Sequence, residues 1–348
     1  MKIKINHRIN FDTERPPLLI AEISSNHKGN KKKFLELIKK AHESGADLIK
    51  IQTYEPKDIA INSSNKKNQI KDGLWKGKNI WDLYKQAYTP FSWHSDAFKL
   101  AKKIKANLFS TPFSERAVDF LEKFKVPLYK VSSFEITDLN LITKIAKTNK
   151  PVIISTGLAN LQEIERALKI IRKYHNKIII MYCVSGYPTP EKEVNIKTIN
   201  LFKKKFKNNL VGLSDHTNGI YSSLAATSLG VVAIEKHFKL KKNSKSLDSE
   251  FSITPDQIKI LKKFSIKIFN TLGKEKKKLK SSEKKSLIFR RSIFTIKDIK
   301  KGQKFNKNNI GNFRPKIGLC SSHYFDVIGR KAKINIKKNR PITRSMTL

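Results

Sequence analysis

Hydrophobic and polar positions follow a regular order along residues 17–272: a short apolar run, a polar loop, then an amphipathic stretch. The apolar runs, which we expect to be strands, are PLLIAEI, ADLIKIQT, NLFST, PLYKVSS, PVIIST, KIIIMYC, NLVGLS and VVAIEKHF. Between them lie stretches such as KKKFLELIKKAHESG, with apolar residues at helical spacing. This alternation predicts an α/β protein with a (β/α)₈ TIM barrel. A doubly wound open sheet is the alternative, but it usually has fewer strands and a glycine-rich first turn, which this sequence lacks.

Two segments depart from this pattern. Residues 54–88 are long for one strand-to-helix connection, and we expect them to cover the mouth of the barrel. Residues 273–287 are charged and of low complexity, which is typical of a linker. Residues 288–348 form short, strand-like, turn-rich segments. We therefore predict a barrel domain over residues 1–272, a linker over 273–287 and a small β-rich domain over 288–348.

The formal net charge of +43 raises the possibility of a polyanion- or nucleic-acid-binding protein. Lysine is, however, spread over nearly every amphipathic stretch and is not gathered on one face with interleaved aromatic residues. We therefore interpret the charge as a compositional bias and expect no specific nucleic-acid partner. Such a charge would still attract anionic substrates.

The cysteine count and the apolar runs bear on location. Two cysteines, Cys183 and Cys320, cannot make a disulfide framework, so a reducing cytoplasm fits best. No apolar run approaches the roughly 20 residues of a membrane-spanning helix, and the first residues do not resemble a signal peptide. We expect a cytoplasmic protein with no membrane partner.

Polar residues stand where the predicted strands end, which is where barrel enzymes carry their chemistry. In chain order these residues are Glu22, Lys50, Gln52, Ser110, Thr111, Lys130, Ser132, Ser133, Glu135, Ser155, Thr156, Ser185, Tyr187, Ser214, Asp215, His216, Glu235, Lys236 and His237. The second to sixth strands offer two lysines and several hydroxyls, which are the donors that a phosphate or carboxylate needs.

The seventh, eighth and first strands are consecutive around a closed barrel, and they offer His216, His237 and Glu22. Two imidazoles and a carboxylate predict an open divalent-metal site with room for water and substrate. A single strand-end histidine is often only a hydrogen-bonded residue, so the prediction depends on the pair. Cys183 is expected to be a small core residue, because no histidine can be paired with it by spacing.

Four other histidines lie in helical or surface contexts and are expected to be solvated. These are His42, His94, His175 and His323.

The ordered motifs of this chain resemble those of the sialic-acid synthase family. They are AEISSNHKGN, IKIQTY, FSTPF, YKVSSFE, ISTG, GLSDHT and IEKHF, followed by RRSIFTIKDIKKGQKF and NFRP, which resemble the antifreeze-like (SAF) β-clip domain of that family. Each motif is weak alone, but the ordered set is specific and runs through essentially the whole chain. The resemblance implies a transferase that condenses phosphoenolpyruvate with an acetamido sugar.

The resemblance also implies roles for individual residues. His216, His237 and, through water, Glu22 would hold Mn²⁺, or alternatively Mg²⁺ or Co²⁺. The residues implied to hold phosphoenolpyruvate are Lys50, Thr111, Lys130, Ser133, Ser155, Ser185 and Ser214. Those implied to face the sugar are Gln52, Tyr187, Asp248 and Arg314. Glu22 and Glu135 are the candidates for proton transfer. Members of the family are homodimers in which the antifreeze-like domain of one chain caps the barrel of the other.

Further segments are similar to the pseudaminic-acid branch of this family, which uses a 2,4-diacetamido-2,4,6-trideoxy hexose. They are IQTYEPKDIAINS, IKDGLW, LYKQAYTPFSWH and LDSEFS. Ser185 stands where the neuraminate branch usually has Asn. The neuraminate and legionaminate branches remain the alternatives, and a metal-dependent aldolase or isomerase is the alternative among other barrel enzymes.

Overall fold

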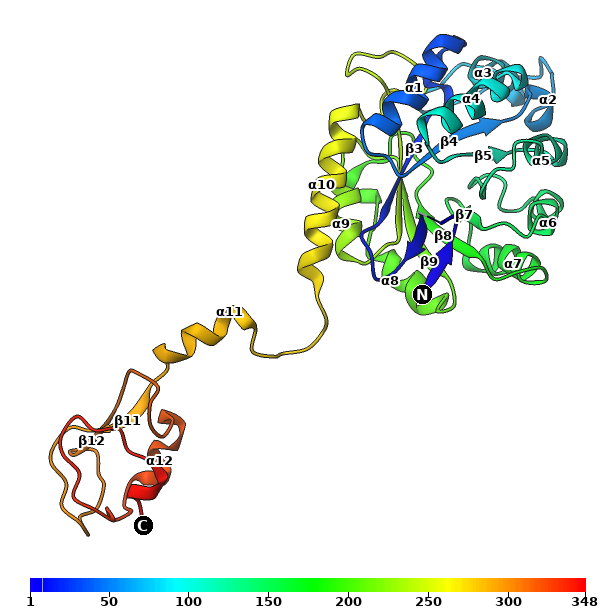
Figure 1. Ribbon diagram of the computed structural model, residues 1–348. Helices are drawn as coiled ribbons and strands as arrows, with labels where there is room; N and C mark the ends of the chain where they lie inside the picture. The colour runs from blue at the N-terminus through cyan, green and yellow to red at the C-terminus, as the bar shows by residue number, and fades with distance from the viewer. Residues whose placement is uncertain (8) are drawn as a thin grey trace. The chain divides into compact units, whose positions relative to one another are not determined.

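The computed structural model describes residues 1–7 and 9–348 (Figure 1). The chain divides into two compact units, Met1–Gly273 and Lys274–Leu348. The first unit contains a closed, all-parallel barrel, whose strands follow one another in the order β10-β3-β4-β5-β6-β7-β8-β9. The predicted (β/α)₈ barrel is therefore confirmed.

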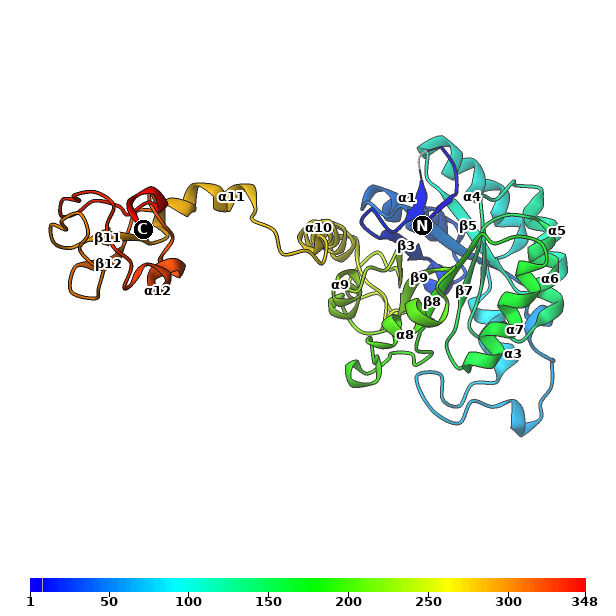
Figure 2. The same ribbon diagram turned by 90° about the horizontal axis from the view of Figure 1, so that it is seen from below.

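The barrel strands coincide with the eight apolar runs of the sequence. They are β3 (Leu18–Glu22), β4 (Leu48–Thr53), β5 (Leu108–Pro112), β6 (Tyr129–Val131), β7 (Val152–Ser155), β8 (Ile178–Cys183), β9 (Leu210–Asp215) and β10 (Ala233–His237). The main outer helices are α1 (Lys31–Glu43), α4 (Phe91–Ile104), α5 (Glu115–Glu122), α6 (Leu139–Lys147), α7 (Leu161–Arg172), α8 (Thr198–Lys205), α9 (Tyr221–Ser228) and α10 (Pro255–Leu272). Figure 2 shows these helices around the strands from a second direction.

Several helices begin where the sequence provides a capping side chain. Asn160 begins α7 by accepting hydrogen bonds from the next turn, while the Glu163 carboxylate returns a bond to the Asn160 amide. Thr254 and Gln257 make the same reciprocal arrangement at α10, which has Pro255 at its first position. Each helix then turns its apolar stripe toward the barrel, so the main core lies between the strands and the helices.

A second apolar cluster fills the amino-terminal end of the barrel interior. It is made by inward-facing residues near the strand starts, such as Ile20 and Leu48, together with Phe11. Phe11 belongs to a hairpin of β1 (Lys2–Lys4) and β2 (Asn10–Asp12), and its side chain is completely buried. The hairpin therefore packs against the end of the barrel opposite to the strand carboxyl termini (Figure 1).

The segment after β4, residues 54–88, contains α2 (Pro56–Ile59) and α3 (Ile80–Ala87). Its Trp75 reaches the connection that follows β10, where the indole Nε1 donates a hydrogen bond to the Leu247 carbonyl at 3.1 Å. The segment thus lies over the carboxyl ends of the strands, as the sequence predicts.

The second unit has little regular structure. Its elements are α11 (Ser281–Lys284), β11 (Ser292–Thr295), β12 (Ile310–Phe313) and α12 (Tyr324–Val327). β11 and β12 form an antiparallel pair, and isolated bridges such as Ile299 to Ile336 connect the loops. A small core that includes Ile293, Phe305 and Ile342 holds the unit together.

Candidate active site

The barrel interior changes from apolar to polar within one step of the strand repeat. Because alternate strand residues face inward, a residue two positions after an apolar interior residue faces the same side but lies nearer the mouth. Ile20 is thus followed by Glu22, Leu48 by Lys50, and Leu128 by Lys130 on three strands. The same step leads from Phe109 to Thr111, from Ile153 to Ser155 and from Ala233 to Glu235.

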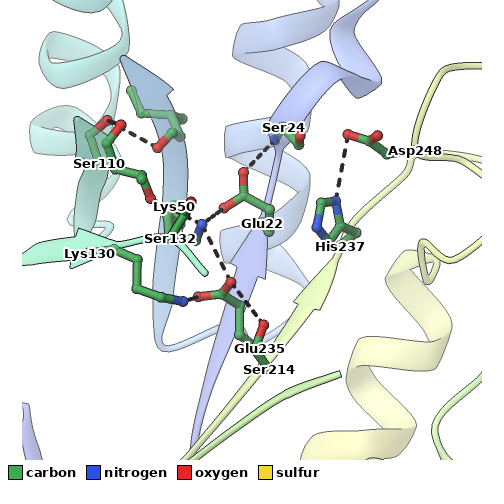
Figure 3. Close-up of polar contacts among 12 residues, drawn as sticks. Glu22, Ser24, Lys50, Ser110, Lys130, Ser132, Ser214, Glu235, His237 and Asp248 are labelled. Atoms are coloured by element: carbon green, nitrogen blue, oxygen red, sulfur yellow. Dashed lines mark hydrogen bonds and ion pairs between the residues drawn. The ribbon is translucent and has the colours of Figure 1, made fainter. Parts of the chain in front are cut away.

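Charged residues of opposite sign alternate in this polar layer (Figure 3). Lys50 Nζ lies 2.5 Å from Glu22 Oε2 and 3.4 Å from Glu235 Oε1, and Lys130 Nζ lies 2.8 Å from Glu235 Oε2. All four side chains are buried. A buried charge is tolerated only when it is paired, and each of these four side chains has a partner of opposite charge.

The environment separates the pKa values of the two carboxyl groups. Burial raises the pKa of Glu22 to about 7, against the opposing effect of Lys50. Burial would also raise the pKa of Glu235, but Lys130 and Lys50 outweigh it and lower that pKa to about 2. Glu235 therefore stays ionised, whereas Glu22 can exchange a proton near neutral pH.

His216 and His237 lie next to each other at the ends of β9 and β10, with ring centroids 5.4 Å apart. His216 Nδ1 is 3.0 Å from the Val184 carbonyl, to which it can donate a hydrogen bond and leave Nε2 free for a ligand. His237 Nδ1 is buried without a hydrogen-bond partner and lies 3.7 Å from Asp248 Oδ2.

An orphaned, buried ring nitrogen beside a second imidazole suits a divalent cation. Across residues 1–7 and 9–348, however, no group of three or more His, Cys, Asp or Glu side chains could hold a metal ion. Water or substrate would therefore supply the remaining ligands of a site built on His216 and His237. Glu22 faces Lys50, so it would contact the metal ion through a water molecule. Its role as a metal ligand stays a prediction.

Most of the other residues predicted for the site line one cavity of about 440 Å³. These are Gln52, Ser133, Ser155, Tyr187, Ser214 and Asp248, and the cavity is also lined by Lys50, Lys130, His216, His237 and the unpredicted Glu235. Two predicted residues lie just behind its wall: Thr111 Oγ1 accepts a hydrogen bond from Lys50 Nζ at 3.2 Å, and Ser185 Oγ lies 4.0 Å from Cys183 Sγ.

Glu135 and Arg314 take other positions. Glu135 accepts a hydrogen bond from Ser132, which lines the cavity, and burial raises the pKa of Glu135. Arg314 belongs to the second unit, where its Nε donates to the Phe289 carbonyl at 2.6 Å and its side chain is exposed. The proposed contact of Arg314 with the sugar therefore stays a prediction.

The outer wall of the cavity is apolar, in contrast to its floor. Residues 54–88 contribute Tyr54, Ile70, Trp75, Leu83 and others to this wall. The Trp75 ring lies 5.6 Å from the ring of Tyr187, centroid to centroid. A ligand in the cavity would therefore meet charge on one side and hydrocarbon or aromatic surface on the other.

Cys183 is buried in the core, as expected, but the supporting argument that no histidine pairs with it was wrong. Its Sγ lies 3.7 Å from His216 Nδ1 across the adjacent strands β8 and β9. The expectation of solvated histidines was wrong for two of the four. His94 and His175 are buried, and His94 Nε2 lies 2.7 Å from Thr53 Oγ1. His94 lies on the core side of α4, on the same face as Ala97 and Ala101. This helical spacing was the signal that could have predicted its burial.

The role of Glu235 was missed. The sequence placed it at a strand end but gave it no role, although it binds both site lysines. The signal was its spacing: Glu235 precedes His237 by two residues and therefore faces the same side of β10.

Two family models match this chain. The NeuB family model matches residues 37–277, and the SAF domain model matches residues 290–346. A pseudaminic acid synthase of Campylobacter jejuni is 40% identical over 94% of this chain and 96% of its own length. An N,N'-diacetyllegionaminic acid synthase of the same species is 37% identical over 93% of this chain and 98% of its own length.

Among solved structures, an N-acetylneuraminic acid synthetase of Leptospira borgpetersenii superposes with a TM-score of 0.74 at 28% identity. The match covers 82% of this chain and 95% of that one. In the described part of the chain, no helix combines the length and apolarity needed to cross a membrane.

Proposed function

Because the chain belongs to the NeuB family of phosphoenolpyruvate-dependent condensing transferases, we propose that it makes pseudaminic acid. The proposed reaction joins phosphoenolpyruvate to 2,4-diacetamido-2,4,6-trideoxy-L-altrose and releases phosphate. The observation that carries the choice of sugar is the similarity to the pseudaminic acid synthases of Campylobacter jejuni and Helicobacter pylori, at 40% and 39% identity. The legionaminate relative, at 37% identity, makes a diacetamido sugar of another configuration the second candidate.

Lys50 and Lys130 are proposed to bind the phosphate and carboxylate of phosphoenolpyruvate. Both ammonium groups line the cavity, and the hydroxyls of Ser133, Ser155 and Ser214 lie around the same space. Charged donors fixed before the substrate arrives can stabilise the charges that move during the reaction. The anionic substrate would share these lysines with Glu22 and Glu235, which now hold them in place.

The NeuB family is generally metal-dependent. We propose that His216 and His237 hold a divalent ion, Mn²⁺ first and Mg²⁺ or Co²⁺ as alternatives. Such an ion would supply Lewis-acid polarisation of the sugar aldehyde oxygen. The orphaned Nδ1 of His237 and the free Nε2 of His216 support this assignment.

The proposed steps form one carbon–carbon bond and one carbon–oxygen bond to water, and they break the carbon–oxygen bond between C2 and the phosphate. C3 of phosphoenolpyruvate attacks the aldehyde carbon, water adds to the cationic C2, and the resulting tetrahedral centre loses phosphate with the bridging oxygen. Glu22 is proposed to take the proton of the water, because its pKa near 7 suits a general base at neutral pH. Glu135 remains the second candidate for proton transfer.

The sugar is proposed to lie between Gln52, Tyr187 and Asp248, under the apolar wall of residues 54–88. The C6 methyl of a trideoxy hexose has no hydroxyl to satisfy, so a wall that contains Ile70 and Leu83 suits it better than a polar one. Arg314 is proposed to reach this sugar from the second unit of a partner chain in a homodimer. The exposed guanidinium and the SAF domain match support that proposal.

A cytoplasmic location is also proposed, because Cys183 and Cys320 are both free cysteines, which suits a reducing compartment. No nucleic-acid partner is part of the proposal.

The test is to incubate the full-length protein with Mn²⁺, phosphoenolpyruvate and a panel of acetamido sugars, and to measure phosphate release. We expect the trideoxy altrose to give the highest kcat/KM, ahead of N-acetylmannosamine and the legionaminate precursor. Equal or better use of N-acetylmannosamine would assign the chain to the neuraminate branch. No release with any sugar, together with salt-resistant binding of polyanions, would favour the polyanion-binding alternative.

A further inference from the structure

Charged residues are found on the outward face of only two barrel strands in the described part of the chain. On the other strands this face, which packs against the helices, carries apolar or neutral residues, for example Ile51, Val131 and Tyr182. The exceptions are Asp215 on β9 and Lys236 on β10, and both side chains are almost completely buried. A buried charged pair in an apolar layer is costly, so it calls for a local reason.

The two residues face each other across neighbouring strands. Asp215 and Lys236 are direct partners in the β9–β10 register, and Lys236 Nζ lies 3.5 Å from Asp215 Oδ2. Ser223 of α9 donates to the same carboxylate oxygen at 2.5 Å. The other carboxylate oxygen accepts from both the amide (2.9 Å) and the hydroxyl (2.7 Å) of Thr217. Asp215 is therefore fully hydrogen-bonded.

These bonds enclose His216. Asp215 precedes it, Thr217 follows it, and the carboxylate of the first holds the amide of the second. Lys236 adds a bond from the neighbouring strand, because its Nζ donates to the Thr217 carbonyl at 2.6 Å. Lys236 also directly precedes His237. One buried cluster thus fixes the backbone on both sides of one histidine and immediately before the other.

We infer that the pair of Asp215 and Lys236 is a positioning device that sets the distance between His216 and His237 and thereby the affinity for a divalent cation. The inference rests on the proposed function, since it takes the two histidines as the cation ligands. Neither Asp215 nor Lys236 touches the cation or substrate in this arrangement. Their contribution is to hold two ligands from different strands at a fixed separation.

Electrostatics and positioning predict opposite effects of removing the lysine. Lys236→Met deletes a positive charge beside two proposed cation ligands and leaves the Asp215 carboxylate in place. If charge alone mattered, the variant would bind cations more tightly. If Lys236 positions the Thr217 carbonyl and so His216, the variant binds more weakly despite the gain in negative charge.

The measurement is the dissociation constant for Mn²⁺ of the full-length, substrate-free protein, obtained by titration with detection of free Mn²⁺ by electron paramagnetic resonance. We expect Lys236→Met to weaken binding about 10- to 100-fold, as loss of a group that supports a ligand typically does. Ser223→Ala removes a single bond to Asp215 and is expected to fold normally, with a smaller loss in the same direction.

Thr53→Val is the matched control. Thr53 is an equally buried, outward-facing residue on β4, and its hydroxyl bonds Ser110 and His94 away from the two site histidines. We expect this variant to lower the thermal unfolding midpoint but to leave the Mn²⁺ affinity within about twofold of wild type.

The outcomes separate this inference from the proposed function. Unchanged or tighter Mn²⁺ binding by Lys236→Met and Ser223→Ala would overturn the positioning role, as would an equal loss in Thr53→Val. Unchanged Mn²⁺ binding by His216→Ala would instead show that the histidines are not the ligands, and it would overturn both.

Discussion

Replacement of Glu235 by Gln should destabilise the barrel and raise its affinity for anions. Glu235 lies between Lys130 at 2.8 Å and Lys50 at 3.4 Å, and all three side chains are buried. Gln keeps the shape but removes the negative charge. The Glu22 carboxylate then pairs with Lys50 alone. Lys130 has no other acidic partner within ion-pair distance among the described residues, so it is left unpaired.

The magnitude follows from this unpaired charge. Removal of one partner from a buried ion pair typically costs about 3–5 kcal/mol. Burial already lowers the pKa of Lys130, so the variant can limit its loss by releasing that proton, which places the expected cost near the lower end, at roughly 3 kcal/mol. An anion that binds the freed lysines, present at a concentration 100 times its dissociation constant, would raise the free energy of unfolding by about 2.7 kcal/mol.

The assay is urea unfolding of the full-length chain followed by tryptophan fluorescence. Trp75, Trp81 and Trp93 are the three tryptophans of the chain and all lie in the first unit, so the signal reports the barrel. Unfolding is measured with and without phosphoenolpyruvate, which should bind the variant more tightly than wild type because a competing carboxylate is gone.

Glu165→Gln is the matched control. Glu165 pairs with Arg172 on the surface, 3.3 Å apart, and loss of such a pair should change stability by no more than about 1 kcal/mol. A cost for Glu235→Gln as small as that of the control, or no preferential stabilisation by phosphoenolpyruvate, would refute the view that Glu235 neutralises the two lysines proposed to bind substrate.

Three shorter predictions concern other parts of the chain. Burial lowers the pKa of His94 to about 4, so protonation of this histidine favours the unfolded state as the pH falls from 6.5 to 4. His94→Gln should remove roughly 3 kcal/mol of the resulting loss in the free energy of unfolding, measured by urea unfolding at a series of pH values. Gly157→Ala would place its methyl against Ser185 Oγ, and we expect a raised KM for phosphoenolpyruvate with a near-normal KM for the sugar; a normal KM for both would contradict a subsite there. Arg314→Ala and Lys130→Ala should each be nearly inactive, and mixing them with subunit exchange should restore about a quarter of the sites; no recovery despite verified exchange would exclude a site completed by the partner.

The barrel was predictable because its evidence is local. Strand runs such as KIIIMYC and the helical spacing between them are written in consecutive residues, and eight such units have few compatible folds. The polar mouth was predictable for the same reason, since a residue at a strand end such as Lys50 or His216 is found by counting from an apolar run.

Contacts between side chains of neighbouring strands were much harder to predict from the sequence. Cys183 and His216 are 33 positions apart, and they meet only because β8 and β9 are neighbours in the closed barrel. Asp215 and Lys236 stand beside the histidines in the sequence but face the opposite side of the strands. Strand periodicity distinguishes the two faces, yet it does not reveal that two outward charges form a pair.

The burial of Phe11 at one end of the barrel affects the order in which substrates bind and products leave at the other end. Since its ring and the apolar layer around it fill the amino-terminal end, that end offers no passage, and both substrates and both products must use the mouth under residues 54–88. The proposed phosphoenolpyruvate site around Lys130 lies on the barrel floor, whereas the proposed sugar site around Tyr187 lies beneath the outer wall. Among the described residues the amino-terminal end is closed by this apolar cluster, and access from the mouth alone favours compulsory-order kinetics, in which phosphoenolpyruvate binds first and the sugar confines it. It also makes release of the bulky sugar acid a step that residues 54–88 can slow.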